Sequence, residues 1–294
     1  MRRRIPADAD TSRSGALRQS ALRADDTDGA LPPYNDRPVN LAEGISVQRV
    51  QGCVALVTGA NRGLGWAYCQ GLLDAGAAKV YGAARDPAAV RSVDPRLVPV
   101  RLDVTSAQDI LAASDQCPDI TLLVNNAGIL RNSPMLGAGA EAAARLEMET
   151  NFFGVLSMAR QFAPRLGENG GGAIVNVLSV ASWFTNPFMA TYCASKAAAE
   201  VVTDAIRMQL RPQGTLVLGV YAGYIDTDMA AGVAQPKTSP QQVVARTLSA
   251  LDSGVERVFA DLRAYDIDRR VRTDREALDA ELERRWNDAR VGHR

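Results

Sequence analysis

Tyr192 and Lys196 have side chains and a spacing that could carry out acid–base chemistry. They stand four residues apart in the stretch TYCASK, and an apolar helical pattern continues from there through Val202. On a helix, this spacing stacks both side chains on one face. An ammonium held near a phenol favours the phenolate and lowers the phenol pKa from its usual value of about 10. The pair is therefore a candidate general acid and base near neutral pH, although the same spacing also occurs on ordinary solvated helices.

The scarcity of histidine excludes several other chemistries. The only histidine is His293, next to the last of the 294 residues. A Ser-His-Asp hydrolase, a Cys-His protease and a His-ligated zinc dehydrogenase each need an imidazole in the folded core. We therefore expect an acid or base of another residue type, and we expect no metal site.

The composition argues against nucleic-acid and membrane partners. Lys plus Arg number 33, and Asp plus Glu also number 33. No basic excess is left to bind a nucleic-acid backbone or an anionic membrane surface. No apolar run approaches the roughly 18 residues of a membrane helix. The four cysteines are scattered without a C-x-x-C pair, which favours a reducing, cytoplasmic location.

Three segments are predicted along the chain. Residues 1–50 are rich in Arg, Asp, Ser, Thr, Gly and Pro, a composition typical of a disordered or extended N-terminal tail. Residues 51–262 are predicted to form one folded domain, and residues 263–294 a C-terminal helical extension. A helix in this extension is expected to begin with a capping box at Thr273 and Glu276. Its apolar stripe comprises Leu278, Leu282, Trp286 and Ala289.

Short apolar runs alternate with longer helical patterns in the predicted domain. Continuous runs of Val, Ile and Leu are typical of strands covered on both faces, as in a parallel sheet. The alternation predicts an α/β fold, a doubly wound parallel sheet with helices on both faces. Two helix starts fit capping boxes, one at Thr105 with Gln108 and one at Ser239 with Gln242. The predicted strands are 53–58, 79–84, 98–102, 120–124, 173–178, 215–220 and 257–260.

A glycine-rich turn follows the first predicted strand and reads Gly59-Ala60-Asn61-Arg62-Gly63-Leu64-Gly65. Glycines let the backbone turn sharply and approach a pyrophosphate, and the N-terminus of the next helix supplies free amides and a partial positive charge. The spacing G-x-x-x-G-x-G differs from the generic G-x-G-x-x-G fingerprint. Its place between the first strand and the first helix nevertheless favours a dinucleotide site.

The end of the second predicted strand bears on which dinucleotide binds. Enzymes of this architecture that use NAD usually have an acidic residue there, which binds the ribose 2′-hydroxyl. Here Ala84 ends the strand and Arg85 follows it, while Arg62 lies inside the glycine turn. Arginine suits a 2′-phosphate. The sequence therefore favours NADP(H), and the nearby Asp86 leaves NAD(H) possible.

Together these motifs resemble those of the short-chain dehydrogenase/reductase family over about residues 52–261. The turn matches T-G-x-x-x-G-x-G, and Tyr192 with Lys196 matches Y-x-x-x-K. Four further family elements are matched by Asp103, the stretch Asn125-Asn126-Ala127-Gly128, Asn151, and Ser179, which stands thirteen residues before the tyrosine. The resemblance implies a Rossmann-like seven-stranded sheet in a single NAD(P)-binding domain at 51–262. It also implies a homodimer or homotetramer formed through helices near 192–210 and 240–251.

The resemblance implies a role for each matched residue. Tyr192 would exchange the proton, Ser179 would donate a hydrogen bond to the substrate oxygen, and Lys196 would lower the tyrosine pKa and bind the nicotinamide ribose. Asn151 would hold a water that links the lysine to solvent. The implied catalytic residues are thus Asn151, Ser179, Tyr192 and Lys196. The implied cofactor-binding residues are Gly59, Asn61, Arg62, Gly63, Leu64, Gly65, Arg85, Asp103, Val104, Asn126, Ala127, Gly128, Tyr192, Lys196, Gly223, Ile225 and Thr227. One departure is Ala222, where the family commonly has proline.

The implied activity is the NADP-dependent interconversion of a ketone or aldehyde and an alcohol, a small-molecule substrate, by hydride transfer. Fold alone does not exclude a regulatory protein that binds NADP without turnover, but a pure binder would not need Tyr192 and Ser179 together. An epimerase or dehydratase usually carries a larger separate substrate domain. The sequence does not predict the substrate. The aromatic side chains of loop 182–189 could line an apolar pocket or pack against a partner subunit.

Overall fold

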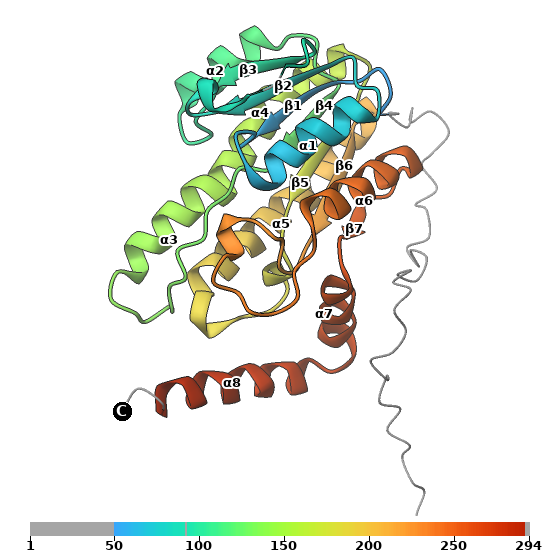
Figure 1. Ribbon diagram of the computed structural model, residues 1–294. Coiled ribbons are helices and arrows are strands. Elements are labelled where there is room, and N and C mark those ends of the chain that lie inside the picture. Colours follow the sequence, from blue (N-terminus) through green and yellow to red (C-terminus); the bar gives the residue numbers. More distant parts are fainter. Residues whose placement is uncertain (1–49, 92, 292–294) are drawn as a thin grey trace, which may run out of the picture. The chain divides into compact units, whose positions relative to one another are not determined.

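A parallel sheet of seven strands runs through the chain (Figure 1). The structure is a computed structural model that describes residues 50–91 and 93–291, so the predicted tail lies, except for its last residue, outside the described residues. The strands are β1 (Val54–Thr58), β2 (Lys79–Ala84), β3 (Leu97–Arg101), β4 (Leu122–Asn125), β5 (Ala173–Val177), β6 (Leu216–Tyr221) and β7 (Arg257–Phe259). Their order in the sheet is β3-β2-β1-β4-β5-β6-β7, with every pairing parallel. The predicted doubly wound sheet is confirmed.

Helices connect the strands and cover both faces of the sheet (Figure 1). They are α1 (Gly63–Asp74), α2 (Ala107–Gln116), α3 (Ala140–Met148), α4 (Gly154–Glu168), α5 (Ala190–Leu210), α6 (Pro240–Ser253), α7 (Leu262–Thr273) and α8 (Arg275–Val291). A π-helical turn, η2 (Glu149–Phe153), joins α3 to α4. Short 3₁₀ turns are η1 (Pro87–Ala89), η3 (Val180–Ser182), η4 (Pro187–Met189), η5 (Arg211–Gln213) and η6 (Asp228–Ala230). None of the helices within the described ranges is long and apolar enough to cross a membrane.

Neighbouring residues of each strand point into opposite apolar layers. Leu56 and Val217 lie in the layer built with α2, α4 and α5. Val57 and Leu218 lie in the layer built with α1 and α6. Because successive strand side chains point to opposite faces, a strand covered on both faces is apolar at most positions. This explains the continuous apolar runs in the sequence.

The helix starts confirm one predicted capping box and correct the other. Ser239 Oγ accepts a hydrogen bond from Gln242 N at 3.2 Å, and Gln242 Oε1 accepts one from Ser239 N at 3.3 Å, as predicted for α6. The box predicted at Thr105 is wrong. Ser106 caps α2 instead, since its Oγ accepts from Asp109 N at 3.2 Å, while the Thr105 hydroxyl donates to the aspartate carboxylate two residues earlier.

The segment after β7 forms two helices, where a single helix from Thr273 was predicted. Thr273 ends α7, and the carboxylate of Asp274 accepts from Ala277 N at 3.4 Å at the start of α8. The predicted capping box is therefore wrong. Leu278 and Leu282 are buried against α7 and η3, as their spacing predicts, whereas the last residue of the predicted stripe, Ala289, is exposed.

Candidate active site

In the glycine turn between β1 and α1, backbone segments lie too close together to leave room for a side chain at Gly65. Gly59 and Gly63 have φ values of 68° and 54°, which glycine adopts without strain. A Cβ added to Gly65 would lie 2.1 Å from Gly59 O and 2.6 Å from Asn126 Nδ2. Any side chain at position 65 would thus force the turn away from both the helix and the segment that follows β4.

We expect Gly65→Ala to lower the free energy of unfolding by about 1–3 kcal/mol, because the clash is with backbone atoms that must move. Gly232→Ala is the matched control, since a Cβ there meets no atom within 4 Å. Urea unfolding of the two variants and the wild type checks the prediction. Equal unfolding midpoints for the two variants would contradict it.

The N-terminus of α1 presents backbone amides that no side chain caps. Arg62 occupies the N-cap position without a side-chain capping bond, and the first turn contains no acidic residue. Free amides and the helix dipole at such an end favour an anion. Asn61 and Arg62 are exposed beside this end, whereas Leu64 is buried beneath it. The turn therefore fits a pyrophosphate.

Thr58 ties the turn to the segment after β4. Its Oγ1 accepts hydrogen bonds from Asn126 N and Ala127 N, each at 3.0 Å. Asn126 Nδ2 donates to Thr58 O at 2.8 Å. The motif alone did not predict this structural role of Thr58, although a hydroxyl group at a strand end could have suggested it.

Charged residues surround the ends of β2 and β3. Arg62 Nη1 bonds Asp228 Oδ2 at 2.9 Å, and both side chains are largely exposed. Arg85 is exposed, and one oxygen of Asp86 caps the η1 turn by accepting from the backbone at 3.0 Å. Burial opposes ionisation of Asp103, but hydrogen bonds from Thr105 and the nearby positive charges of Arg85 and Arg101 lower its pKa. The next residue, Val104, is buried.

Tyr192 and Lys196 share one buried face of α5, as their spacing predicts. Their exposed fractions are 9% and 6%. Lys196 Nζ lies 5.8 Å from the centre of the Tyr192 ring and donates to Val177 O at 2.9 Å. The carboxyl end of β5 thus holds the amine beside the ring.

The pKa values of this pair differ from the expectation that the lysine lowers the tyrosine pKa. Burial raises the pKa of Tyr192, and the nearby Cys193 and Glu147 raise it further. A hydrogen bond with the Ser179 hydroxyl acts in the opposite direction and lowers it. Burial also lowers the pKa of Lys196 to about 8. Desolvation disfavours the charged form of each group and is the largest cause of both shifts. The expected lowering is therefore wrong for the protein by itself.

Ser179 lies just after β5, at the N-cap of η3. Its Oγ accepts from Ala181 N at 3.1 Å and donates to Ala222 O at 3.5 Å. The second bond joins it to the loop after β6, where Ala222 O also accepts from Val180 N at 3.1 Å. These bonds restrain the loop at Ala222, where the family commonly has proline.

Asn151 lies in the π-helical turn η2 and has no exposed surface. Its side chain bonds both backbone polar groups of Ile129 and donates to Ser195 Oγ, each at 2.9 Å. A Cβ at Gly128 would lie 3.2 Å from Asn151 Oδ1 and 3.7 Å from Lys196 Nζ. Asn151, Gly128 and Lys196 therefore meet at one point beside Tyr192. Ser195, which sequence analysis missed, links this point to α5.

The loop after β6 reaches both the glycine turn and the C-terminal segment. Gly223 N donates to Asp261 Oδ2 at 2.8 Å, and Ile225 forms a bridge with residue 238. A Cβ on Gly63 would lie 3.2 Å from Thr227 Cγ2, so Thr227 contacts the turn. The structure thus brings the predicted residues of this loop to the same end of the sheet as the turn.

The aromatic residues of loop 182–189 pack mostly inside their own chain. Trp183 Nε1 donates to Glu200 Oε1 at 2.9 Å, and its ring stacks on Tyr221 at 4.3 Å. Phe184 is buried against α7 and α8. Phe188 is 39% exposed and contacts Trp286 of α8 edge to face at 5.1 Å. Neither predicted alternative holds for Phe184, because α7 and α8 supply the apolar surface that covers it, while the partly buried Trp183 ring packs on β6 and β7.

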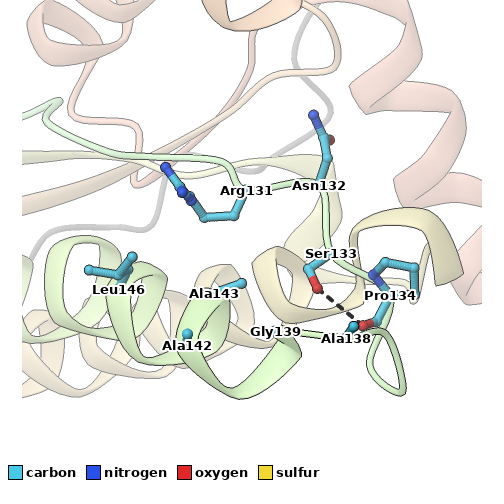
Figure 2. A pocket seen from close by; sticks show the side chains of 9 residues that line it. All are labelled: Arg131, Asn132, Ser133, Pro134, Ala138, Gly139, Ala142, Ala143 and Leu146. Atoms are coloured by element: carbon cyan, nitrogen blue, oxygen red, sulfur yellow. Dashed lines mark hydrogen bonds between the residues drawn. The ribbon is translucent and has the colours of Figure 1, made fainter.

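A pocket lies between α3 and the segment before it (Figure 2). No residue predicted for the site lines this pocket. Its lining is formed by Arg131, Asn132, Ser133, Pro134, Ala138, Gly139, Ala142, Ala143 and Leu146.

Known proteins resemble this chain in both sequence and structure. The family model for short chain dehydrogenases matches residues 53–238. A solved short chain dehydrogenase from Burkholderia cenocepacia J2315 in complex with NADP is 44% identical, with a TM-score of 0.77 over 80% of this chain and 99% of that chain.

Two curated relatives are more distant. The 11-beta-hydroxysteroid dehydrogenase A of Sesamum indicum is 34% identical over 62% of this chain and 55% of its own length. The 3-oxoacyl-(acyl-carrier-protein) reductase FabG of Vibrio cholerae is 32% identical over 61% of this chain and 76% of its own length. The chain therefore spans about half the length of the first of these relatives. The family model covers most of the sheet and includes the glycine turn. The chain therefore belongs to the NAD(P)-dependent short-chain dehydrogenase/reductase family of enzymes.

Proposed function

We propose that the protein interconverts a ketone or aldehyde and an alcohol with NADP(H), and that Tyr192 is its general acid and base. The observation that carries this proposal is the meeting of Tyr192, Ser179, Lys196 and Asn151 beside Gly128. Gly128 follows β4 and the glycine turn follows β1, and the strand order reverses between these two neighbours. Ligands of open α/β sheets bind at such a switch point, outside the carboxyl ends of the strands.

The residues that would hold the dinucleotide lie along this edge of the sheet. Amides of the glycine turn and of α1 would bind the pyrophosphate, and Asp103 with Val104 would contact the adenine. Asn126, Ala127 and Gly128 would line the middle of the cofactor, while Gly223, Ile225 and Thr227 would contact the nicotinamide end. Bound NADPH supplies a hydride to the carbonyl carbon.

The chain's own groups would manage the proton and the developing charge. Tyr192 Oη would donate its proton to the carbonyl oxygen, and Ser179 Oγ would donate a hydrogen bond to the same oxygen. Both donors are buried, so they stabilise negative charge that grows in the transition state without competition from water. Because burial raises its pKa, the phenol carries the proton at neutral pH and can donate it. Lys196 would bond the nicotinamide ribose, and its charge there would help Tyr192 act as a base in alcohol oxidation.

Exposed arginines support NADP(H) as the preferred cofactor. We expect Arg85→Ala to raise the KM for NADPH about tenfold or more and to leave the KM for NADH within about twofold, since a charge-assisted hydrogen bond contributes about 1.5–3 kcal/mol. Arg145→Ala serves as the control, because Arg145 is exposed on α3 and bonds only its neighbour Glu141 in the structure's described part. Steady-state kinetics with both cofactors check the prediction. Equal effects of Arg85→Ala on the two cofactors would contradict it.

A direct assay tests the proposed function. Purified protein is mixed with NADPH and with ethyl acetoacetate, benzaldehyde or cyclohexanone, and the loss of NADPH absorbance is followed. We expect turnover of at least one carbonyl compound and slower turnover with NADH. Tight NADPH binding without turnover of any carbonyl would instead favour a regulatory protein that only binds the cofactor.

Self-association is part of this proposal. Val201 and Met208 stand seven residues apart on α5, and each is 69% exposed. Exposed apolar side chains one heptad apart on a helix can pack against a second copy. The four cysteines are buried with free thiols, which agrees with the proposed cytoplasmic location.

A further inference from the structure

Three side chains without exposed surface hold the segment 129–133, which we call the strap. The strap follows the N-N-A-G stretch and carries Leu130, whose side chain packs against Tyr192. Its alternate residues Ile129, Arg131 and Ser133 are bonded by Asn151, Glu147 and Thr191, respectively. The strap therefore forms one wall of the site around Tyr192, and buried polar groups fix its position.

Glu147 is the charged member of these three. It stands on α3 four residues before Asn151, and its Oε1 accepts from Arg131 N at 2.7 Å. Helix α3 packs against α5, which carries Tyr192. Glu147 is thus linked to the site in two indirect ways, by its bond to the strap and by the packing of its helix on α5.

The second carboxyl oxygen of Glu147 is buried without a hydrogen bond in the described part of the chain, and packing alone does not account for this. Oε2 is buried and has no hydrogen-bond partner among the described residues. Burying a carboxyl group without full hydrogen bonding is costly, and each such group in a folded protein calls for an explanation. A glutamine could make the same bond to Arg131 N without a charge, so the strap alone does not require a glutamate.

We propose that Glu147 is a positioning residue for the reaction proposed above, which holds the strap against Tyr192 and places a negative charge behind the phenol. The inference rests on the proposed function for its catalytic part. Its structural part, the anchoring of the strap, is independent of that function.

The charge of Glu147 acts on the proton of Tyr192. Besides burial, Glu147 and Cys193 raise the pKa of Tyr192. The strap carries Arg131, and α5 carries Lys196 beside the ring. The remaining charged residues of these helices are Glu141 and Arg145 on α3 and Glu200, Asp204 and Arg207 on α5, and none of them is among the groups that shift the pKa of Tyr192. A carboxylate near a phenol disfavours the phenolate, most strongly where water is excluded. Glu147 therefore adds to the effect of burial, which is the main cause of the raised pKa of Tyr192.

The pH dependence of turnover tests this role with Glu147→Gln. The amide retains an oxygen for Arg131 N and loses the charge, so the pKa of Tyr192 should fall. The rate of NADP-dependent oxidation is measured against pH with ethyl 3-hydroxybutyrate, benzyl alcohol or cyclohexanol. We expect the rising part of this profile, the oxidation limb, to move to lower pH by about half a unit to one unit. Glu149→Gln is the matched control, since Glu149 lies two residues away but is exposed. Coincident limbs for Glu147→Gln and the wild type would overturn the proposal.

Glu147→Asp separates the charge from the strap. Aspartate keeps the charge but is one methylene too short for the bond to Arg131 N. We expect the oxidation limb to stay within about 0.3 units of the wild type, while the Arg131 amide exchanges its hydrogen about tenfold faster or more, because its bond is lost. If the oxidation limb of Glu147→Asp moved to lower pH by about half a unit or more, the charge effect would be rejected. This measurement tests the charge effect even if Glu147→Gln does not fold.

Failure of the proposed function gives a different result from failure of this inference. A wild-type protein that oxidises none of the alcohols and reduces none of the carbonyls rejects the proposed function. Hydrogen exchange at Arg131 in Glu147→Asp and Glu147→Gln then still tests the strap. Unchanged exchange in Glu147→Asp would reject Glu147 as its anchor.

Discussion

Tyr192→Phe is expected to reduce kcat by about 10²- to 10⁴-fold, the range that a positioned general acid contributes. The variant removes one hydroxyl group and keeps the ring, which is buried among Ala181, Cys193, Leu130 and Met189. The fold and the glycine turn should therefore be unaffected. Dissociation constants for NADPH, measured by fluorescence titration, should remain within about threefold of the wild type, because the phenol would act on the substrate oxygen and not on the pyrophosphate.

Tyr265→Phe provides the control for this experiment. Tyr265 lies on α7 and is 41% exposed. Loss of its hydroxyl should leave kcat unchanged. If Tyr192→Phe turned over its substrate as fast as the wild type, Tyr192 could not be the proton donor. A large loss of NADPH affinity together with kcat would point to a structural role of the hydroxyl instead.

Lys196→Met is expected to abolish most activity and yet to stabilise the protein near pH 7. Burial lowers the pKa of Lys196 to about 8, below its usual 10.5. Holding this amine charged in the fold therefore costs on the order of 3 kcal/mol at pH 7. Methionine fills a similar volume without a charge. It leaves Val177 O without the lysine hydrogen bond, a loss of about 1–3 kcal/mol, so the net gain should be at most about 2 kcal/mol.

The sign of this effect should reverse with pH. The folded pKa of Lys196 is lower than the unfolded pKa, so between about pH 8 and 10.5 the unfolded chain binds more protons than the folded one. Wild-type stability relative to the variant therefore rises through this window. Above it the charge penalty is gone, only the lost hydrogen bond remains, and Lys196→Met should be the less stable protein.

Urea unfolding at several pH values checks both parts of this prediction. Lys237→Met, at a partly exposed lysine of the loop after β6, should change the free energy of unfolding by less than about 0.5 kcal/mol. A constant difference between Lys196→Met and the wild type across the whole pH range would show that the amine is not buried as a charged group.

Local patterns predicted the sheet with few errors. The predicted strand 79–84 coincides with β2 (Lys79–Ala84), and the other strands differ by one or two residues at their ends. A strand covered on both faces needs only a continuous apolar run, which is visible without knowing its neighbours. The glycine turn and the N-N-A-G stretch lie at one edge of the sheet, because β1 and β4 are parallel neighbours and end on the same side.

Two of the predicted helix starts are wrong because a neighbouring side chain, not the predicted one, caps the helix. Thr105 and Ser106 both have hydroxyl groups that can cap α2, and the structure uses Ser106. Thr273 was equally plausible for the last helix, but it belongs to α7, and Asp274 takes the capping position. Capping depends on which of several adjacent side chains reaches a free amide, and a sequence pattern alone does not decide that.

By itself the sequence determined where the strands lie, where the backbone turns on glycine, and that Tyr192 and Lys196 share a helix face. Each of these depends on residues close together in the chain. Only the tertiary structure decided how deeply this pair is buried, which raises the pKa of the phenol and lowers that of the amine. It also decided that the carboxyl group of Glu147 is buried and bonded to Arg131 N. Desolvation and charge act through space, and here they come from α3, β5 and the strap, which are far from Tyr192 in the sequence.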